Sequence, residues 1–128
     1  MRTNARSVIR ILLVEDEPKL RQSLIEGLKL EEWRVTGAAS GTEAWQHLDA
    51  EVFDLVVLDW MLPDCDGMEI VRRLRAQGNS LPVLMITARG GASSEVLLKQ
   101  SGATDYLVKP FSFDDLLARC RVLLTSAS

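Results

Sequence analysis

Carboxylates, a hydroxyl and an amine stand at the ends of four short apolar runs of this sequence. Glu15 and Asp16 follow the first run, Asp59 follows the second, Thr87 closes the third and Lys109 follows the fourth. If these runs are parallel strands of one sheet, their carboxyl ends share the edge at which open α/β sheets bind ligands. Side chains far apart in the sequence would then form one acidic pocket that contains a single amine.

Three carboxylates gathered in this way repel one another and need a compensating cation. At an effective dielectric constant near 20, two like charges about 4 Å apart cost roughly 4 kcal/mol. Oxygen ligands without an imidazole select a hard ion, so we expect Mg²⁺, with Mn²⁺ as a substitute. Because Mg²⁺ bridges carboxylates to phosphate oxygens, the pocket indicates phosphoryl chemistry.

Asp59 ends the central run and is the candidate nucleophile, since attack by a carboxylate on phosphorus gives an acyl phosphate. Lys109 can offer its positive charge to one phosphoryl oxygen, and Thr87 can donate its hydroxyl to another. Such a site works by positioning and charge neutralisation. Taken singly, each of these residues is better explained as part of a solvated polar rim. The functional interpretation depends on their occurring together.

Composition limits the class of protein. The 128 residues fit one domain, and an apolar content of 47% is sufficient for a core. A net charge of −3 argues against a general nucleic-acid surface, so DNA contacts would need another domain. The two cysteines, Cys65 and Cys120, indicate free thiols, and no apolar run is long enough to span a membrane. We expect a cytoplasmic protein without membrane contacts.

Strand and helix patterns alternate along the whole chain. Helices are expected to begin near Glu17, after a capping Ser40, after the turn 63–67, near Glu95 and after a capping Ser112. The expected strands are residues 8–14, 33–38, 53–58, 81–87 and 104–108. This pattern predicts an α/β fold, a flavodoxin-like (βα)5 three-layer sandwich whose parallel five-stranded sheet has the order 2-1-3-4-5. The predicted divisions are a flexible N-terminus (1–7), the domain (8–124) and a linker or tail (125–128).

Four segments together carry a resemblance to a known family: residues 11–17 (ILLVEDE), 58–67 (LDWMLPDCDG), 86–89 (ITAR) and 105–111 (DYLVKPF). In this order and spacing the chain, from about residue 8 to 124, resembles the receiver domain of two-component response regulators. Met61, the pair 88–89 and the pair 110–111 are similar to the OmpR subfamily of transcription factors.

The resemblance implies a phosphorylation-activated signalling receiver that takes a phosphoryl group from a sensor histidine kinase onto Asp59. It implies that Thr87 and Lys109 hold this group, and that the protein is not an enzyme beyond self-phosphorylation and self-dephosphorylation. The implied Mg²⁺ ligands are three side chains and one backbone carbonyl: Glu15, Asp16, Asp59 and the carbonyl of Met61.

In the family, phosphorylation draws the threonine inward and the aromatic residue of the fifth strand, here Tyr106, rotates with it. Tyr106 is otherwise explained as a half-buried strand residue. In the subfamily, the fourth helix, fifth strand and fifth helix form a phosphorylation-dependent homodimer, and DNA is bound by a C-terminal winged-helix domain that this chain lacks. The matching charged positions here are Asp105, Asp115, Arg119 and Arg121. Thr104 departs from the subfamily, which usually has an acid there.

Two other functions would need residues that this sequence does not have at the matching positions. A haloacid-dehalogenase-like phosphohydrolase would need a second acid two residues after Asp59, where this chain has Met61. A flavodoxin-like FMN carrier would need a Ser/Thr/Gly-rich loop where residues 15–17 are all acidic. Glu17, Asp64 and Asp66 suit helix starts and turns better than metal ligation, whereas Trp60 is either a pocket-edge or a surface aromatic.

Overall fold

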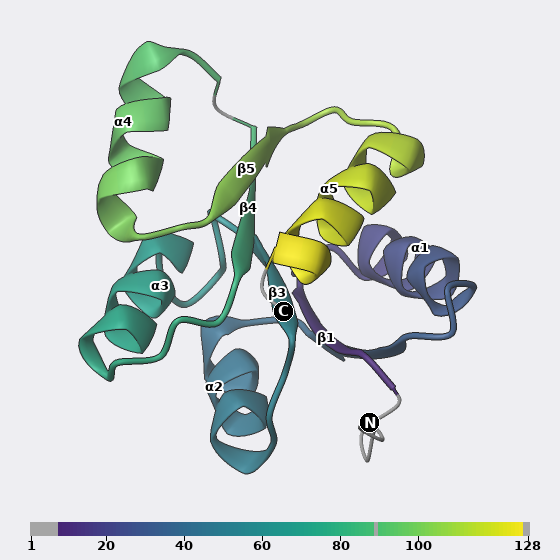
Figure 1. The fold of residues 1–128 in the computed structure, drawn as a ribbon. Coiled ribbons are helices and arrows are strands. Elements are labelled where there is room, and N and C mark those ends of the chain that lie inside the picture. Colours follow the sequence, from purple (N-terminus) through teal and green to yellow (C-terminus); the bar gives the residue numbers. More distant parts are fainter. Residues whose placement is uncertain (1–7, 89, 127–128) are drawn as a thin grey trace.

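The computed structural model describes residues 8–88 and 90–126; the predicted flexible segment 1–7 and residues 127–128 lie outside them. In the described part, five strands alternate with five helices (Figure 1). Their bounds are β1 Arg10–Val14, α1 Pro18–Lys29, β2 Arg34–Ala38, α2 Gly41–Ala50, β3 Leu55–Asp59, α3 Gly67–Ala76, β4 Val83–Thr87, α4 Ala92–Ser101, β5 Asp105–Val108 and α5 Phe113–Ser126.

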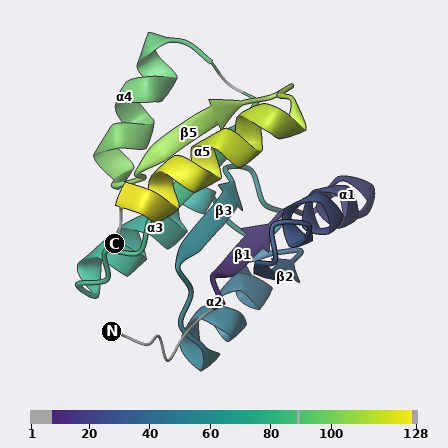
Figure 2. The same cartoon turned by 45° about the vertical axis from the view of Figure 1, so that its right-hand side comes forward.

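The strands form one parallel sheet in the order β2-β1-β3-β4-β5, which confirms the predicted fold class. Helices α1 and α5 cover one face of the sheet, and α2, α3 and α4 cover the other (Figures 1 and 2). The described residues include no helix that is both long and apolar enough to cross a membrane.

Each strand buries side chains on both faces, since successive residues of a strand point to opposite sides. In β1, Leu12 and Val14 pack toward α2 and α3, whereas Ile11 and Leu13 pack toward α1 and α5. Cys120 is buried with this second cluster, and burial raises the pKa of its thiol to about 12. The two cores fix the sheet from both sides and therefore fix the positions of its strand ends.

Helices α1 and α2 start at the residues that the sequence signals indicated. Glu17 caps α1 by accepting bonds from the amides of Lys19 and Leu20, which confirms its role as a helix-start acid. Ser40 Oγ accepts the Glu43 amide at the start of α2. The Glu43 carboxylate reaches back to the amide of residue 39, one position before the capping serine.

Several boundaries differ from those predicted. Strand β1 starts at Arg10 rather than at residue 8, and β3 includes Asp59 itself. Helix α4 starts at Ala92, three residues before the predicted start, and α5 continues to Ser126. The start of α4 has no side-chain capping bond, so its small residues carried no helix signal.

Candidate functional site

The carboxyl ends of the inner strands bring the predicted acidic residues together. Strands β1 and β3 are neighbours with Val14 opposite Leu58, so the residues that follow, Glu15 and Asp59, lie side by side. One carboxylate oxygen from each of Glu15, Asp16 and Asp59 lies within 4.8 Å of the other two. We call these three residues the acidic triad. Glu15 and Asp59 are buried, whereas Asp16 is exposed and opens the triad to solvent.

Lys109 joins the triad from the end of β5. Its Nζ donates to Asp59 Oδ2 at 3.0 Å and to Glu15 Oε1 at 3.2 Å. Burial alone would lower the pKa of this amine, but the hydrogen bonds and charges of Asp59 and Glu15 outweigh burial and raise it. Lys109 is therefore charged at neutral pH and partly compensates the triad.

The crowding of acids also affects the carboxyl group of Glu15. Burial and, less strongly, the neighbouring Asp59 raise the pKa of its carboxyl to about 7, although the Glu17 amide, which donates to Glu15 Oε2 at 3.0 Å, opposes this rise. One amine is thus insufficient to compensate three acids. The donor set of carboxylate oxygens with an open, exposed member fits a hard divalent cation such as Mg²⁺.

Thr87 and Met61 complete the surroundings of Asp59. Thr87 is the last residue of β4 and is almost fully buried, and its carbonyl accepts the Lys109 amide at 2.7 Å. The Met61 amide donates to Asp59 Oδ1 at 3.1 Å, while the Met61 side chain is exposed. The structure therefore places Glu15, Asp16, Asp59, Thr87 and Lys109 at one edge of the sheet.

Tyr106 lies on β5 and its hydroxyl donates to Glu95 of α4 at 2.8 Å. This bond, which the sequence did not reveal, raises the pKa of Tyr106 and lowers that of Glu95. Arg119 on α5 pairs with Asp105 at 3.0 Å and donates to the Tyr106 carbonyl at 3.0 Å.

The other residues predicted for a dimer face are separated. The Asp115 amide is tied to the capping Ser112 at 3.0 Å. Arg121 instead pairs with Glu31, beyond the end of α1, at 2.6 Å. Asp105 and Arg119 are thus in contact with each other, whereas Arg121 is directed toward α1.

Two residues of the turn after β3 differ from the sequence interpretation. Trp60 is only 2% exposed and packs in the core on the side of α2 and α3, so its interpretation as a surface aromatic is wrong. Asp64 binds the start of α2, a contact that no local signal could have revealed because its partners lie 22 and 23 residues away. Asp66 caps α3 by accepting the Met68 amide, as its place before Gly67 suggested.

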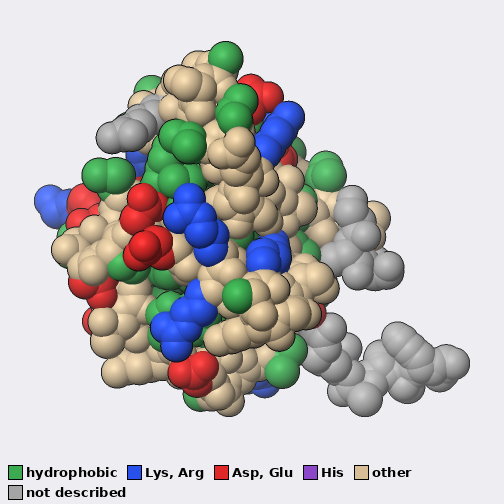
Figure 3. Space-filling model, turned by 90° about the vertical axis from the view of Figure 1, so that its left-hand side faces the viewer, with side chains coloured by type: hydrophobic (Ala, Val, Ile, Leu, Met, Phe, Trp, Pro, Cys, Tyr) green, Lys and Arg blue, Asp and Glu red, His purple; other side chains and the backbone are tan. Residues whose placement is uncertain are grey.

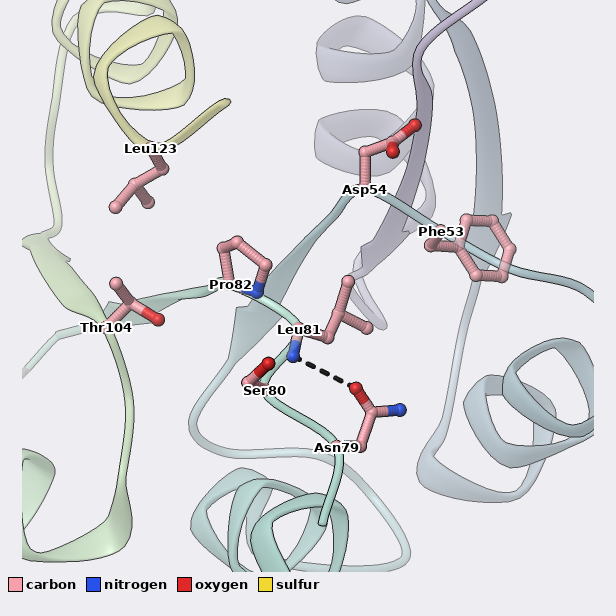
Figure 4. A pocket seen from close by; sticks show the side chains of 8 residues that line it. All are labelled: Phe53, Asp54, Asn79, Ser80, Leu81, Pro82, Thr104 and Leu123. Atoms are coloured by element: carbon pink, nitrogen blue, oxygen red, sulfur yellow. Dashed lines mark hydrogen bonds between the residues drawn. The ribbon is translucent and has the colours of Figure 1, made fainter. Parts of the chain in front are cut away.

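Two surface pockets lie at different distances from this site. A cavity of about 450 Å³ lies at the amino ends of the strands, since Asp54, Pro82 and Thr104 directly precede β3, β4 and β5 (Figure 4). It is at the opposite edge of the sheet from the triad. A larger, mostly apolar groove of about 830 Å³ lies between α1 and the start of α5 and includes Lys109.

The surface turned toward the viewer in Figure 3 carries basic and acidic side chains beside one another. A nucleic-acid surface is usually dominated by positive charge. This face therefore lacks the expected signature of DNA contact.

Comparisons with known proteins agree with this geometry. The model of the response regulator receiver domain family matches residues 11–121. The chain is 44% identical over 117 residues to response regulator RppA of Synechocystis sp., covering 90% of this chain and 50% of RppA. It is 47% identical over 117 residues to the transcriptional regulatory protein TcrA of Mycobacterium tuberculosis, covering 91% and 46%. The chain thus spans about half the length of the curated relatives it matches.

Solved structures give the same result. The receiver domain of the Francisella response regulator 1452 superposes with a TM-score of 0.89 at 30% identity, covering 94% of this chain and 99% of that one. The response regulator TrrA of Thermotoga maritima, solved in complex with Mg(2+)-BeF, has a TM-score of 0.81 at 32% identity, covering 91% and 99%.

Proposed function

The chain belongs to the response regulator receiver domain family, with relatives among OmpR-family regulators, and we propose that it accepts a phosphoryl group on Asp59. A receiver is a phosphoryl acceptor rather than a classical enzyme. We propose that residues 8–124 form this functional unit. The single observation that supports the proposal best is the bonding of Lys109 to both Asp59 and Glu15 inside the acidic triad.

Asp59 supplies the nucleophile. One of its oxygens forms a bond to phosphorus while the bond from phosphorus to the imidazole nitrogen of a kinase phosphohistidine breaks, and the imidazole leaves neutral because its other ring nitrogen carries a proton. We propose that Lys109 moves from Asp59 Oδ2 to a phosphoryl oxygen, which keeps its charge paired. Thr87 would donate its hydroxyl to another phosphoryl oxygen.

The proposed Mg²⁺ ligands are Glu15, Asp16, Asp59 and the backbone carbonyl of Met61. When bound, the ion would neutralise charge on the carboxylates and on the transferring phosphoryl group. The triad supports this assignment through its oxygen-only donors and its exposed member, Asp16, which leaves one side open to phosphate and water.

We further propose the partners of this module. A sensor histidine kinase is the donor, consistent with membership of a two-component family. Because relatives about twice as long include a transcriptional regulatory protein, we propose that phosphorylation controls homodimerisation of a transcription regulator in the cytoplasm. DNA contact would then come from a winged-helix domain outside this chain.

Beryllofluoride, a stable mimic of a phosphoryl group on Asp, tests the proposal. Trp60 is buried directly after Asp59, so we expect Mg²⁺ with beryllofluoride to change the tryptophan fluorescence. Trp60→Phe separates this signal from the background of Trp33 and Trp45. Asp59→Asn is expected to abolish the beryllofluoride response. If neither Mg²⁺ at millimolar concentration nor Mg²⁺ with beryllofluoride changes the tryptophan fluorescence of the wild type, the proposed function is excluded.

A further inference from the structure

The turn between β3 and α3, residues 60–66, is closed by its own backbone. The Gly67 amide donates to the Trp60 carbonyl at 2.7 Å, and the Leu62 amide donates to the Cys65 carbonyl at 3.2 Å. Met61 and Asp66 also form an isolated antiparallel bridge. These bonds connect the tip of the turn to its base, so a contact at the tip can affect the position of Met61.

Asp64, at the tip of the turn, is bonded to another element. Its Oδ1 accepts the Gly41 amide at 2.8 Å, and its Oδ2 accepts the amide and hydroxyl of Thr42 at 2.9 and 2.8 Å. Both oxygens of the carboxylate are thus held by the first two residues of α2. Three bonds to an ionised acceptor are among the stronger hydrogen bonds available to an exposed side chain.

Gly41 allows this close approach. A Cβ added at Gly41 would lie directly against Cys65 Sγ and 3.3 Å from Asp64 Oδ1. Helix α2 also has a local cap, because Ser40 already accepts the Glu43 amide. Asp64 therefore does more than cap the start of a helix, because its bonds also connect the turn to α2.

The base of the same turn contacts the proposed phosphoacceptor. The Met61 amide holds Asp59 Oδ1 at 3.1 Å while Lys109 holds Oδ2 at 3.0 Å. We propose that Asp64 is a positioning residue that anchors the turn on α2, an inference that rests on the proposed function. By holding the turn, Asp64 keeps Met61 in place to orient Asp59 and to bind Mg²⁺. It contacts neither the triad nor a phosphoryl group in this arrangement.

Mg²⁺ affinity measures this role without any turnover. We expect Asp64→Ala to raise the Mg²⁺ Kd, followed by tryptophan fluorescence, about tenfold, at the lower end of what is typical for residues that orient metal ligands. Thr42→Val keeps two of the three bonds and should raise Kd only two- to threefold, by about 0.4–0.7 kcal/mol. Asp49→Ala, which removes an exposed carboxylate near the other end of α2, is the charge-matched control and should stay within twofold.

Amide hydrogen exchange at Met61 gives a second measurement in metal-free protein. It should accelerate in Asp64→Ala relative to Asp49→Ala, since the turn is released from α2. If Asp64→Ala lowers stability but leaves the Mg²⁺ Kd within twofold of Asp49→Ala, Asp64 is only a helix cap and the proposal is wrong. If Asp64→Ala does not fold, Thr42→Val replaces it, and a Mg²⁺ Kd equal to that of Asp49→Ala would likewise show that the proposal is wrong. A wild type that binds no Mg²⁺ would overturn the proposed function instead, and this inference with it.

Discussion

Lys109 bonds to the acidic triad in this structure and is proposed to bind the phosphoryl group after transfer. Its amine pairs with two carboxylates of the acidic triad, at 3.0 Å from Asp59 and 3.2 Å from Glu15. These contacts stabilise the metal-free fold. The amine would also compete with the proposed Mg²⁺ for the same oxygens, because both are positive charges and Glu15 and Asp59 are proposed ligands of the ion.

This competition predicts that Lys109→Met lowers the stability of the metal-free protein but increases the stabilisation by Mg²⁺. Removing the amine leaves two buried carboxylates without that donor, so the metal-free free energy of unfolding should fall by about 1–3 kcal/mol. Mg²⁺ should then stabilise the variant more than the wild type, because its rival is gone, while beryllofluoride binding is lost. Urea unfolding with and without Mg²⁺ measures both effects.

Lys29→Met, at the end of α1, is the control for loss of one positive charge. It should leave the stabilisation by Mg²⁺ unchanged. Equal stabilisation of wild type and Lys109→Met by Mg²⁺ would contradict the idea that amine and metal compete.

At the level of residues, the sequence predicted the acidic pocket because its side chains follow strand ends. Glu15, Asp59 and Lys109 follow apolar runs, and parallel pairing brings such ends together. The burial of Trp60 and the bonds of Asp64 were not predictable in this way. Both depend on how an irregular turn folds against α2 and α3, which no periodic pattern encodes.

At the scale of elements, the link between the turn and α2 should depend on pH. The bonds from Gly41 and Thr42 lower the pKa of Asp64 to about 2, below the unfolded value of about 3.9. A depressed pKa means that the folded state prefers the ionised carboxylate. Its contribution to stability is therefore full above about pH 4 and is lost as the pH falls toward 2.

Urea unfolding between pH 5 and pH 3 tests this sign. The stability of the wild type should fall more steeply over this range than that of Asp64→Asn, which has no carboxylate to protonate. Asp49→Asn should keep the steep slope of the wild type. Parallel slopes for all three proteins would show that the Asp64 contacts do not contribute to stability.

The boundaries of elements were predicted less well than their existence. Helices with a side-chain cap, such as α1 at Glu17 and α2 at Ser40, began where the sequence indicated. Helix α4 follows Gly91, which has a φ of 103° and provides no side-chain cap. It begins with Ala92, Ser93 and Ser94, and serine is equally common in loops, so the sequence marks this start only weakly and the packing of Leu98 into the core supports the helix.

For the whole molecule, the alternation of strand and helix patterns in the sequence was sufficient to predict the layers and the strand order. Apolar strands buried on both faces require helices on both sides, and right-handed crossovers leave few arrangements. The assembly of two such molecules is less constrained by pattern. It depends on which charged side chains of α5 remain available on the face shared with β5 and α4.

Helix geometry divides these side chains. Asp115 and Arg119 are four residues apart and share one side of α5, and Val122, three residues later, is exposed near them. Arg121 is rotated by about 200° from Arg119 at roughly 100° per residue, and it pairs with Glu31 near α1. We therefore expect the proposed dimer to use Arg119 rather than Arg121.

Sedimentation velocity distinguishes these two arginines. The protein should be monomeric without beryllofluoride and should shift toward a dimer with Mg²⁺ and beryllofluoride. Arg119→Ala removes the partner of Asp105 and should weaken this dimer about tenfold, whereas Arg121→Ala loses an exposed pair with Glu31 and should change it less than twofold. Equal weakening of the dimer by both substitutions would mean that both sides of α5 contact the partner. This result would contradict the prediction, because the single face formed by α4, β5 and α5 includes only one side of α5.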